Sequence, residues 1–179
     1  MIDKGSSNSS VFVKGKNNLI DSLTEKAVWT IRKFASKEDY IKGNFYEESI
    51  IKGNILLNEG INTIWTLVAG GSATPFNSSN SYLGVGDSTT SESPTQTGLQ
   101  ATTNKLYKAV DSGYPIYGAN EEIIFRTTFN EGEANFPWNE FTIANGNSDS
   151  AVNLNRKVSS QGTKVSGQIW ELTLKINLS

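Results

Sequence analysis

Three carboxylates and one tryptophan form the arrangement in this chain that comes nearest to catalytic chemistry. Glu131, Glu133 and Glu140 flank Trp138. A glycoside hydrolase needs two carboxyl groups held across a sugar, and Trp138 could supply an aromatic platform. Strand alternation places Trp138 and Glu140 on one side and Phe141 on the other. Because clustered charges are usually solvated, we interpret the carboxylates as surface groups and the aromatic residues as part of a core or a subunit contact.

A second polar cluster has the spacing of calcium ligands. Asn145, Asn147 and Asp149 occupy alternate positions, as the oxygen ligands of a calcium loop do. However, the glycine comes too early, at Gly146, and the twelfth position holds Arg156 where a glutamate is required. An Asn-Gly pair is typical of a hairpin turn, so we expect a polar turn here.

The glycine motifs and the missing residue types argue against other chemistries. Gly84-Val-Gly86 lacks the third glycine and the following helix of a dinucleotide-binding loop, and Gly162 and Gly167 have no phosphate-loop context. The chain has no cysteine and no histidine, which excludes disulfides and cysteine nucleophiles and removes the commonest general base and metal ligand. We therefore predict no catalytic, cofactor-binding or metal site, and a protein that is not an enzyme.

Charge and hydropathy argue against nucleic acid and membrane as partners. The formal net charge is −2, and the 16 basic residues are scattered without a dense cluster. The apolar stretch Ile61 to Ala69 contains Asn62 and is too short to span a membrane. Residues 1–10 are polar and lack the apolar core of a signal peptide. We expect synthesis in a cytoplasm.

The later part of the chain is dominated by strand patterns with period two. In the last segment, Trp170, Leu172, Leu174 and Ile176 alternate with polar residues, which predicts a strand central to the core. Strands are predicted over Ala27–Ala35, Tyr82–Gly86, Lys105–Val110, Ile123–Phe129, Trp138–Ala144, Val152–Val158 and Trp170–Leu178.

One clear α-helix is predicted, at about residues 58–69. Asn58 is expected to cap its start, and Gly70-Gly71 to end it. An apolar stripe at helical spacing normally faces the core, so we expect Trp65 to anchor the helix there. The stripe consists of Ile61, Ile64, Trp65 and Val68.

Strands without intervening helices imply antiparallel pairing. We predict a mainly β protein: a β-sandwich or jelly-roll-like domain over residues 54–179 with the helix at an edge, preceded by an N-terminal arm over residues 1–53. A closed barrel would share the same alternation. Within the arm, Ser36 and Asp39 predict the start of a short helical turn. For residues 3–10 we leave two interpretations open: terminal disorder, or a leader that orders on a neighbouring subunit. Our hypothesis is that the arm as a whole reaches onto neighbouring subunits.

Several motifs follow one another in a fixed order over residues 54–179. They are an apolar helix ending in Gly-Gly, then Phe76-Asn77, Tyr82 to Thr90, Gln96 to Leu99, Ser112 to Pro115, Phe125 to Phe129, Glu133 to Asn135, Trp138 to Glu140, Asn155 to Lys157 and Ser166 to Leu174. This order resembles a family of short structural proteins of tailed bacteriophages, variously described as head decoration, auxiliary or tail-fibre-like. The resemblance implies a virion role without catalysis and synthesis in the cytoplasm of the host bacterium, and it supplies no site residues.

Three functions are consistent with the predicted fold and the resemblance. The first is a capsid decoration or head auxiliary protein, which we expect to form a homo-oligomer and to bind other virion proteins, with the major capsid protein as the expected partner. The second is a tail, baseplate or fibre-attachment component. The third is a carbohydrate-binding module, since fold alone does not separate these classes. Fibre proteins usually continue into long repeats, and this chain has none, which favours the head.

Overall fold

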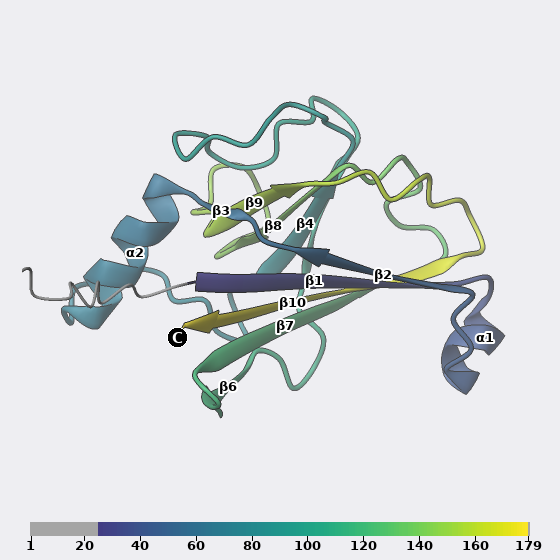
Figure 1. Cartoon of the computed structure of the whole chain (residues 1–179), viewed down its shortest axis with the longest axis horizontal. Coiled ribbons are helices and arrows are strands. Elements are labelled where there is room, and N and C mark those ends of the chain that lie inside the picture. The colour runs from purple at the N-terminus through teal and green to yellow at the C-terminus, as the bar shows by residue number, and fades with distance from the viewer. Residues whose placement is uncertain (1–24, 179) are drawn as a thin grey trace, which may run out of the picture.

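The computed structural model describes residues 25–178, which form two antiparallel sheets of five strands each, packed face to face (Figure 1). Sheet A contains, in spatial order, β2 (Glu47–Lys52), β1 (Glu25–Phe34), β10 (Ile169–Leu178), β7 (Glu122–Phe129) and β6 (Ile116–Ala119). Sheet B contains β3 (Ile55–Leu56), β9 (Asn155–Val158), β8 (Glu140–Ala144), β4 (Tyr82–Gly86) and β5 (Lys105–Ala109). The helices α1 (Lys37–Lys42) and α2 (Asn58–Val68) lie at opposite ends of the sandwich. The predicted mainly β sandwich is confirmed.

The last strand, β10, is the central strand of sheet A. Leu174 is fully buried and stands in register with Trp29 on one side and Phe125 on the other. The inward-facing side chains of β10 meet sheet B, as the strict alternation predicted. The exception is Leu178, which is 45% exposed at the end of the strand.

An aromatic cluster fills the space between the sheets. The Trp138 ring lies 4.9 Å from the rings of Phe129 and Trp170 and 6.2 Å from Phe141, all at steep angles. Such edge-to-face pairs add about 0.5–1.5 kcal/mol each beyond their area burial. Trp138 is fully buried, so its interpretation as a core residue is confirmed.

The predicted boundary between an N-terminal arm and the sandwich, at residue 53, is wrong. β1 lies between β2 and β10, and Trp29 and Ile31 are fully buried in the common core. Residues 25–53 are therefore part of the sandwich, because their apolar alternation continues the core of sheet A. The leader over residues 3–10, and the rest of residues 1–24, lie outside the described residues.

The helix ends follow the expected chemistry in part. Ser36 caps α1 by accepting a hydrogen bond from the Asp39 amide at 3.1 Å, as predicted. After α2, Gly70 adopts the left-handed conformation expected of a stop signal. Asn58, however, is the first residue of α2 and not its cap; the cap position is Leu57, whose side chain makes no capping bond. Neither helix within residues 25–178 is long and apolar enough to cross a membrane.

Candidate functional site

The first turn of α2 is fixed tightly to sheet B. The Leu57 amide donates to the Leu154 carbonyl at 3.0 Å, and the Glu59 carboxylate accepts from the Asn153 amide at 2.8 Å. Gly60 lies directly against the chain at Leu154, where an added Cβ would be only 2.5 Å from backbone atoms. Glu59 therefore anchors the start of the helix, and the glycine allows the two backbones to approach.

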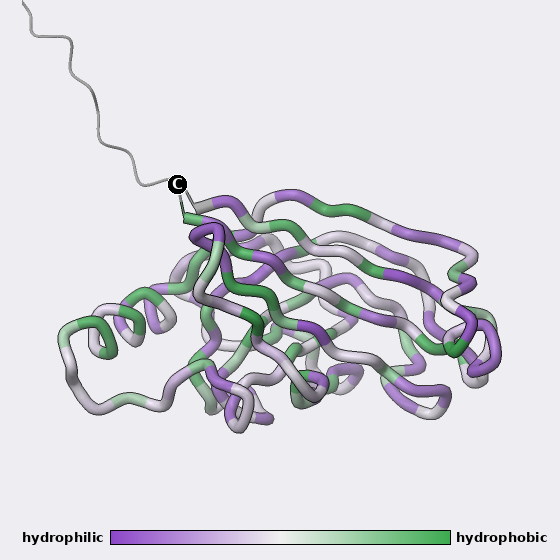
Figure 2. Tube along the Cα trace, turned by 90° about the horizontal axis from the view of Figure 1, so that it is seen from below, coloured by the Kyte–Doolittle hydropathy of each residue, from purple (hydrophilic) through white to green (hydrophobic). Residues whose placement is uncertain are grey.

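The apolar stripe of α2 points largely into solvent. Trp65 is 60% exposed and Val68 is 71% exposed, so the prediction that Trp65 anchors the helix in the core is wrong. The buried side of the helix is formed by Gly60 and Thr63, two small residues that permit close contact with the loop before β9. Figure 2 shows α2 projecting from the end of the sandwich with hydrophobic residues along its turns. The helix thus offers an apolar surface that residues 25–178 leave uncovered.

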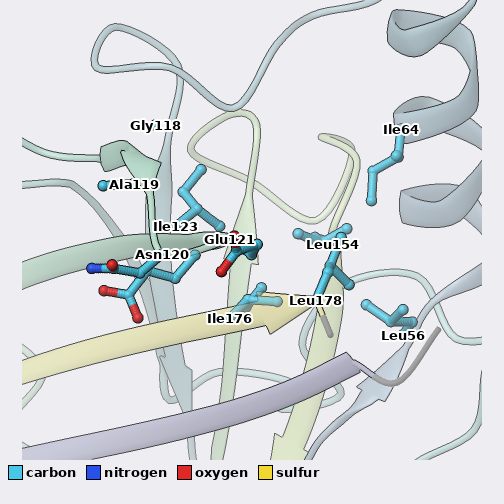
Figure 3. A pocket seen from close by; sticks show the side chains of 11 residues that line it. Leu56, Ile64, Gly118, Ala119, Asn120, Glu121, Ile123, Leu154, Ile176 and Leu178 are labelled. Atoms are coloured by element: carbon cyan, nitrogen blue, oxygen red, sulfur yellow. The ribbon is translucent and has the colours of Figure 1, made fainter.

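An apolar cavity of about 640 Å³ adjoins this helix, between α2 and the ends of both sheets. Figure 3 shows the side chain of Ile64 pointing from α2 toward Leu154 and Leu178. Ile64 belongs to the stripe, so the cavity and the exposed face of the helix form one continuous apolar surface, which we call the α2 end. The apolar side chains that line the cavity are Leu56, Ile64, Ala119, Ile123, Leu154, Ile176 and Leu178.

The rim of the cavity carries a strained turn with acidic residues. Asn120 and Glu121, which connect β6 to β7, have φ values of 56° and 53°. Both are in the left-handed region, as a tight hairpin turn requires, but Glu121 lacks the freedom of the glycine usual there. The Leu178 amide donates to the Glu121 carbonyl at 3.1 Å and holds this turn against β10. Strained backbone of this kind clusters at ligand-binding sites.

The carboxylates that resembled a catalytic pair are placed differently from the prediction. Glu140 is fully buried on the outer face of sheet B, beneath residues 87–104, and forms an ion pair at 2.7 Å with the fully buried Arg156. Its interpretation as a solvated edge carboxylate is wrong. Gly86 provides the space, because a Cβ there would overlap the Glu140 carboxylate. Trp138 contacts Phe141 in the core, so it does not share a side with Glu140.

The other two glutamates belong to a separate group of contacts. Burial opposes ionisation of Glu133, but Lys108 and the Asn130 amide together hold the pKa of Glu133 below its usual value. Burial lowers the pKa of the neighbouring Lys164 to about 8, and its ammonium donates to the Asn130 carbonyl at 2.7 Å. The Glu131 backbone carbonyl accepts hydrogen bonds from later residues. Glu133 and Glu140 are thus neutralised by different cations, an arrangement that stabilises loops and does not provide a pair for sugar hydrolysis.

The turn that resembled a calcium loop has a structural role. Asp149 accepts a hydrogen bond from the Tyr107 hydroxyl at 2.8 Å and forms an ion pair with Lys105. The Asn145 side chain accepts from the Val152 amide at 2.9 Å and closes the turn. Within residues 25–178, no group of three or more acidic side chains is arranged to hold a metal ion. The polar turn predicted between β8 and β9 is confirmed.

The comparisons with known proteins do not assign the chain to a family. No protein-family model matches it, and neither curated proteins nor solved structures gave a match. The α2 end, with its exposed apolar residues and its apolar cavity, is therefore our candidate binding surface.

Proposed function

We propose that this protein is a non-enzymatic structural component of a tailed-bacteriophage virion, and that it binds the capsid surface as a decoration or head auxiliary protein. The proposal combines the order of motifs over residues 54–179, which resembles short phage structural proteins, with the α2 end as the surface that contacts other virion proteins. The partner of first choice is the major capsid protein.

One observation supports a protein partner above all: Trp65 and Val68 are exposed on a helix that is continuous with an apolar cavity. A soluble chain rarely exposes contiguous apolar surface unless the surface binds something. Tryptophan is also enriched among the residues that dominate protein–protein binding energies. A sugar-binding surface would instead combine aromatic rings with free polar groups, whereas the cavity lining is mostly aliphatic.

Quantitative mass spectrometry of purified particles of the phage that encodes the chain tests this function. Hundreds of copies per particle support the head assignment. A handful of copies would instead support a location in the tail, the baseplate or the fibre attachment. Absence from the particle would refute a virion role. A glycan array would test the carbohydrate-binding alternative, which specific saturable binding would favour.

The proposed surface is tested by a Trp65→Glu variant, with Asn62→Glu, at an exposed polar residue of the same helix, as the matched control. We expect the Trp65 variant to lose at least tenfold in particle occupancy, because about 1.4 kcal/mol of lost binding energy gives a factor of ten. The control should bind as the unmodified protein does. Unchanged occupancy of the Trp65 variant would show that Trp65 does not contact the particle.

A further inference from the structure

The described chain begins at the mouth of the cavity. β1 starts at Glu25, which is paired in register with Leu178, and Leu178 lines the cavity. In Figure 1 this end of β1 lies beside the end of β10 and on the same side of the molecule as α2. The covalent link between residue 24 and Glu25 therefore lies next to this apolar opening.

The sequence before Glu25 contains the residue types that such a cavity would bind. Val11-Phe-Val13 and Leu19-Ile20 are two apolar clusters, and they are separated by Lys14-Gly-Lys16 and two asparagines. An extended chain covers at most about 3.3–3.6 Å per residue, so Ile20, five positions before Glu25, can lie up to roughly 17 Å from it. The second cluster is therefore within reach of the cavity, and the first can follow it by folding back.

The cavity also matches these clusters in size and charge. Its volume of about 640 Å³ lies within the range of roughly 300–1,000 Å³ in which pockets enclose a compact ligand. Glu121 and Glu122 stand at its rim, and Lys175 lies 3.3 Å from Glu122. Within residues 25–178 no ion pair engages Glu121. The lysines between the apolar clusters have the opposite charge to this free rim carboxylate.

We propose that residues 11–20 dock into the cavity of their own chain. Their apolar clusters cover the aliphatic lining, and Lys14 or Lys16 pairs with Glu121. Docking within one chain is favoured over docking between chains because a short tether gives an effective concentration in the millimolar range. This inference does not depend on the proposed function, since it concerns the isolated protein. Trp65 and Val68 do not line the cavity, so a docked segment leaves them exposed for a partner.

Introduced cysteines test this docking in the full-length chain. The protein has no cysteine of its own, so two substitutions create the only pair of thiols. We pair Phe12→Cys with Ile64→Cys, which lies on the cavity side of α2. The matched control pairs Phe12→Cys with Asn62→Cys, which is exposed on the other side of the same helix. After mild oxidation, a non-reducing gel and intact mass report the products.

We expect the pair at position 64 to form a monomeric disulfide at least tenfold faster than the control. Equal rates would overturn the proposal, because they would mean that residue 12 has no preference for the cavity. A disulfide-linked dimer would also overturn it, since the segment would then occupy the cavity of a second copy. If Ile64→Cys prevents folding, Phe12→Cys with Leu178→Cys makes the same test at the exposed mouth, and a slow reaction there would refute docking.

Discussion

Replacing Glu140 by Gln should remove a large part of the stability of this protein. The Glu140 carboxylate accepts hydrogen bonds from the amides of Gln100 and Ala101 at 2.9 and 2.7 Å. It also accepts from the Arg156 guanidinium at 2.8 Å, and both charged side chains are fully buried. A glutamine keeps the shape but loses the charge, and its amide nitrogen turns a donor toward groups that are donors themselves.

The expected loss can be estimated from these contacts. Breaking one partner of a buried ion pair costs about 3–5 kcal/mol. In the variant, Arg156 keeps the Thr90 carbonyl and the Gln96 side chain as acceptors, at 2.9 and 3.0 Å. The cost of removing its carboxylate partner should therefore lie near the lower end of this range, at about 3 kcal/mol. One backbone amide left without an acceptor adds about 1–3 kcal/mol. The sum, roughly 4–6 kcal/mol, is a large fraction of the 5–15 kcal/mol by which a domain is usually stable.

Urea denaturation followed by tryptophan fluorescence measures this loss, because Trp138 and Trp170 are buried in the core. The matched control is Glu48→Gln. Glu48 forms an ion pair of similar length, 2.6 Å, with Arg32, but both side chains are partly exposed to solvent. Exposed pairs contribute about 0–1 kcal/mol, so the control should unfold almost as the unmodified protein does.

Two outcomes would show that this reasoning is wrong. One is a Glu140→Gln variant within 1 kcal/mol of the unmodified protein, and the other is an equal loss in the Glu48 control. A double variant, Glu140→Leu with Arg156→Met, separates the causes. Because it removes both charges together, it should be clearly more stable than the single charge-removing variant.

Four further predictions concern stability. Leu174→Asp should prevent folding, because it places a charge in the fully buried centre of β10; unchanged melting by circular dichroism would contradict the core assignment. Gly60→Ala should lose about 1–3 kcal/mol in urea denaturation despite the better helix propensity of alanine, since its Cβ would lie 2.5 Å from the backbone of the loop before β9. Glu121→Gly should gain about 1 kcal/mol and raise the Tm by roughly 2–4 °C in calorimetry by removing the left-handed strain, and a lower Tm would show that the side chain contributes more than the strain costs. Lys164 has a folded-state pKa of about 8, below the 10.5 of a free lysine, so the unfolded chain binds more protons between pH 8 and 10. The free energy of unfolding should therefore rise with pH over this range, by up to about 1.4 kcal/mol per unit, and a Lys164→Gln variant should lack this rise.

Most of the fold follows from alternation that can be read in the sequence. β7 and β10 were predictable because most of their inward residues are large and apolar while most of their outward residues are polar. β6 was not predicted, since all four of its residues are exposed and its pairing depends on the neighbouring strand. The boundary at residue 53 was misplaced because a strand pattern does not reveal its sheet partner, and β1 pairs with a strand more than 130 residues later.

The two errors at the candidate sites have a shared physical cause. The stripe on α2 identifies an apolar face, but it cannot say how much of that face meets the core. The close approach at Gly60 turned the side with Gly60 and Thr63 inward and left Trp65 exposed. The position of Glu140 on the polar face of a strand predicted solvent. Residues 87–104 cover that face, and Arg156 comes from another strand. In both cases the deciding contact is remote in sequence. The signal for the cavity, aliphatic residues at strand ends, is equally present in ordinary core strands.

The distribution of exposed apolar side chains gives the proposed binding a direction. The outer side of sheet A is polar at its centre: Glu171 there is flanked by Arg32 and Arg126, at 3.7 and 3.8 Å. The outer side of sheet B is covered by residues 87–104 over the Glu140–Arg156 pair. Large exposed apolar residues are therefore found at the ends of the sandwich and on its edge strands, such as Trp65 and Val68 on α2 and Ile50 on β2, and not at the centres of its two faces. A partner that recognises apolar surface must approach such an end or edge, and the α2 end joins an exposed helix to a cavity. In a particle, this contact would leave both polar faces toward solvent, which suits a protein that projects from the surface to which it binds.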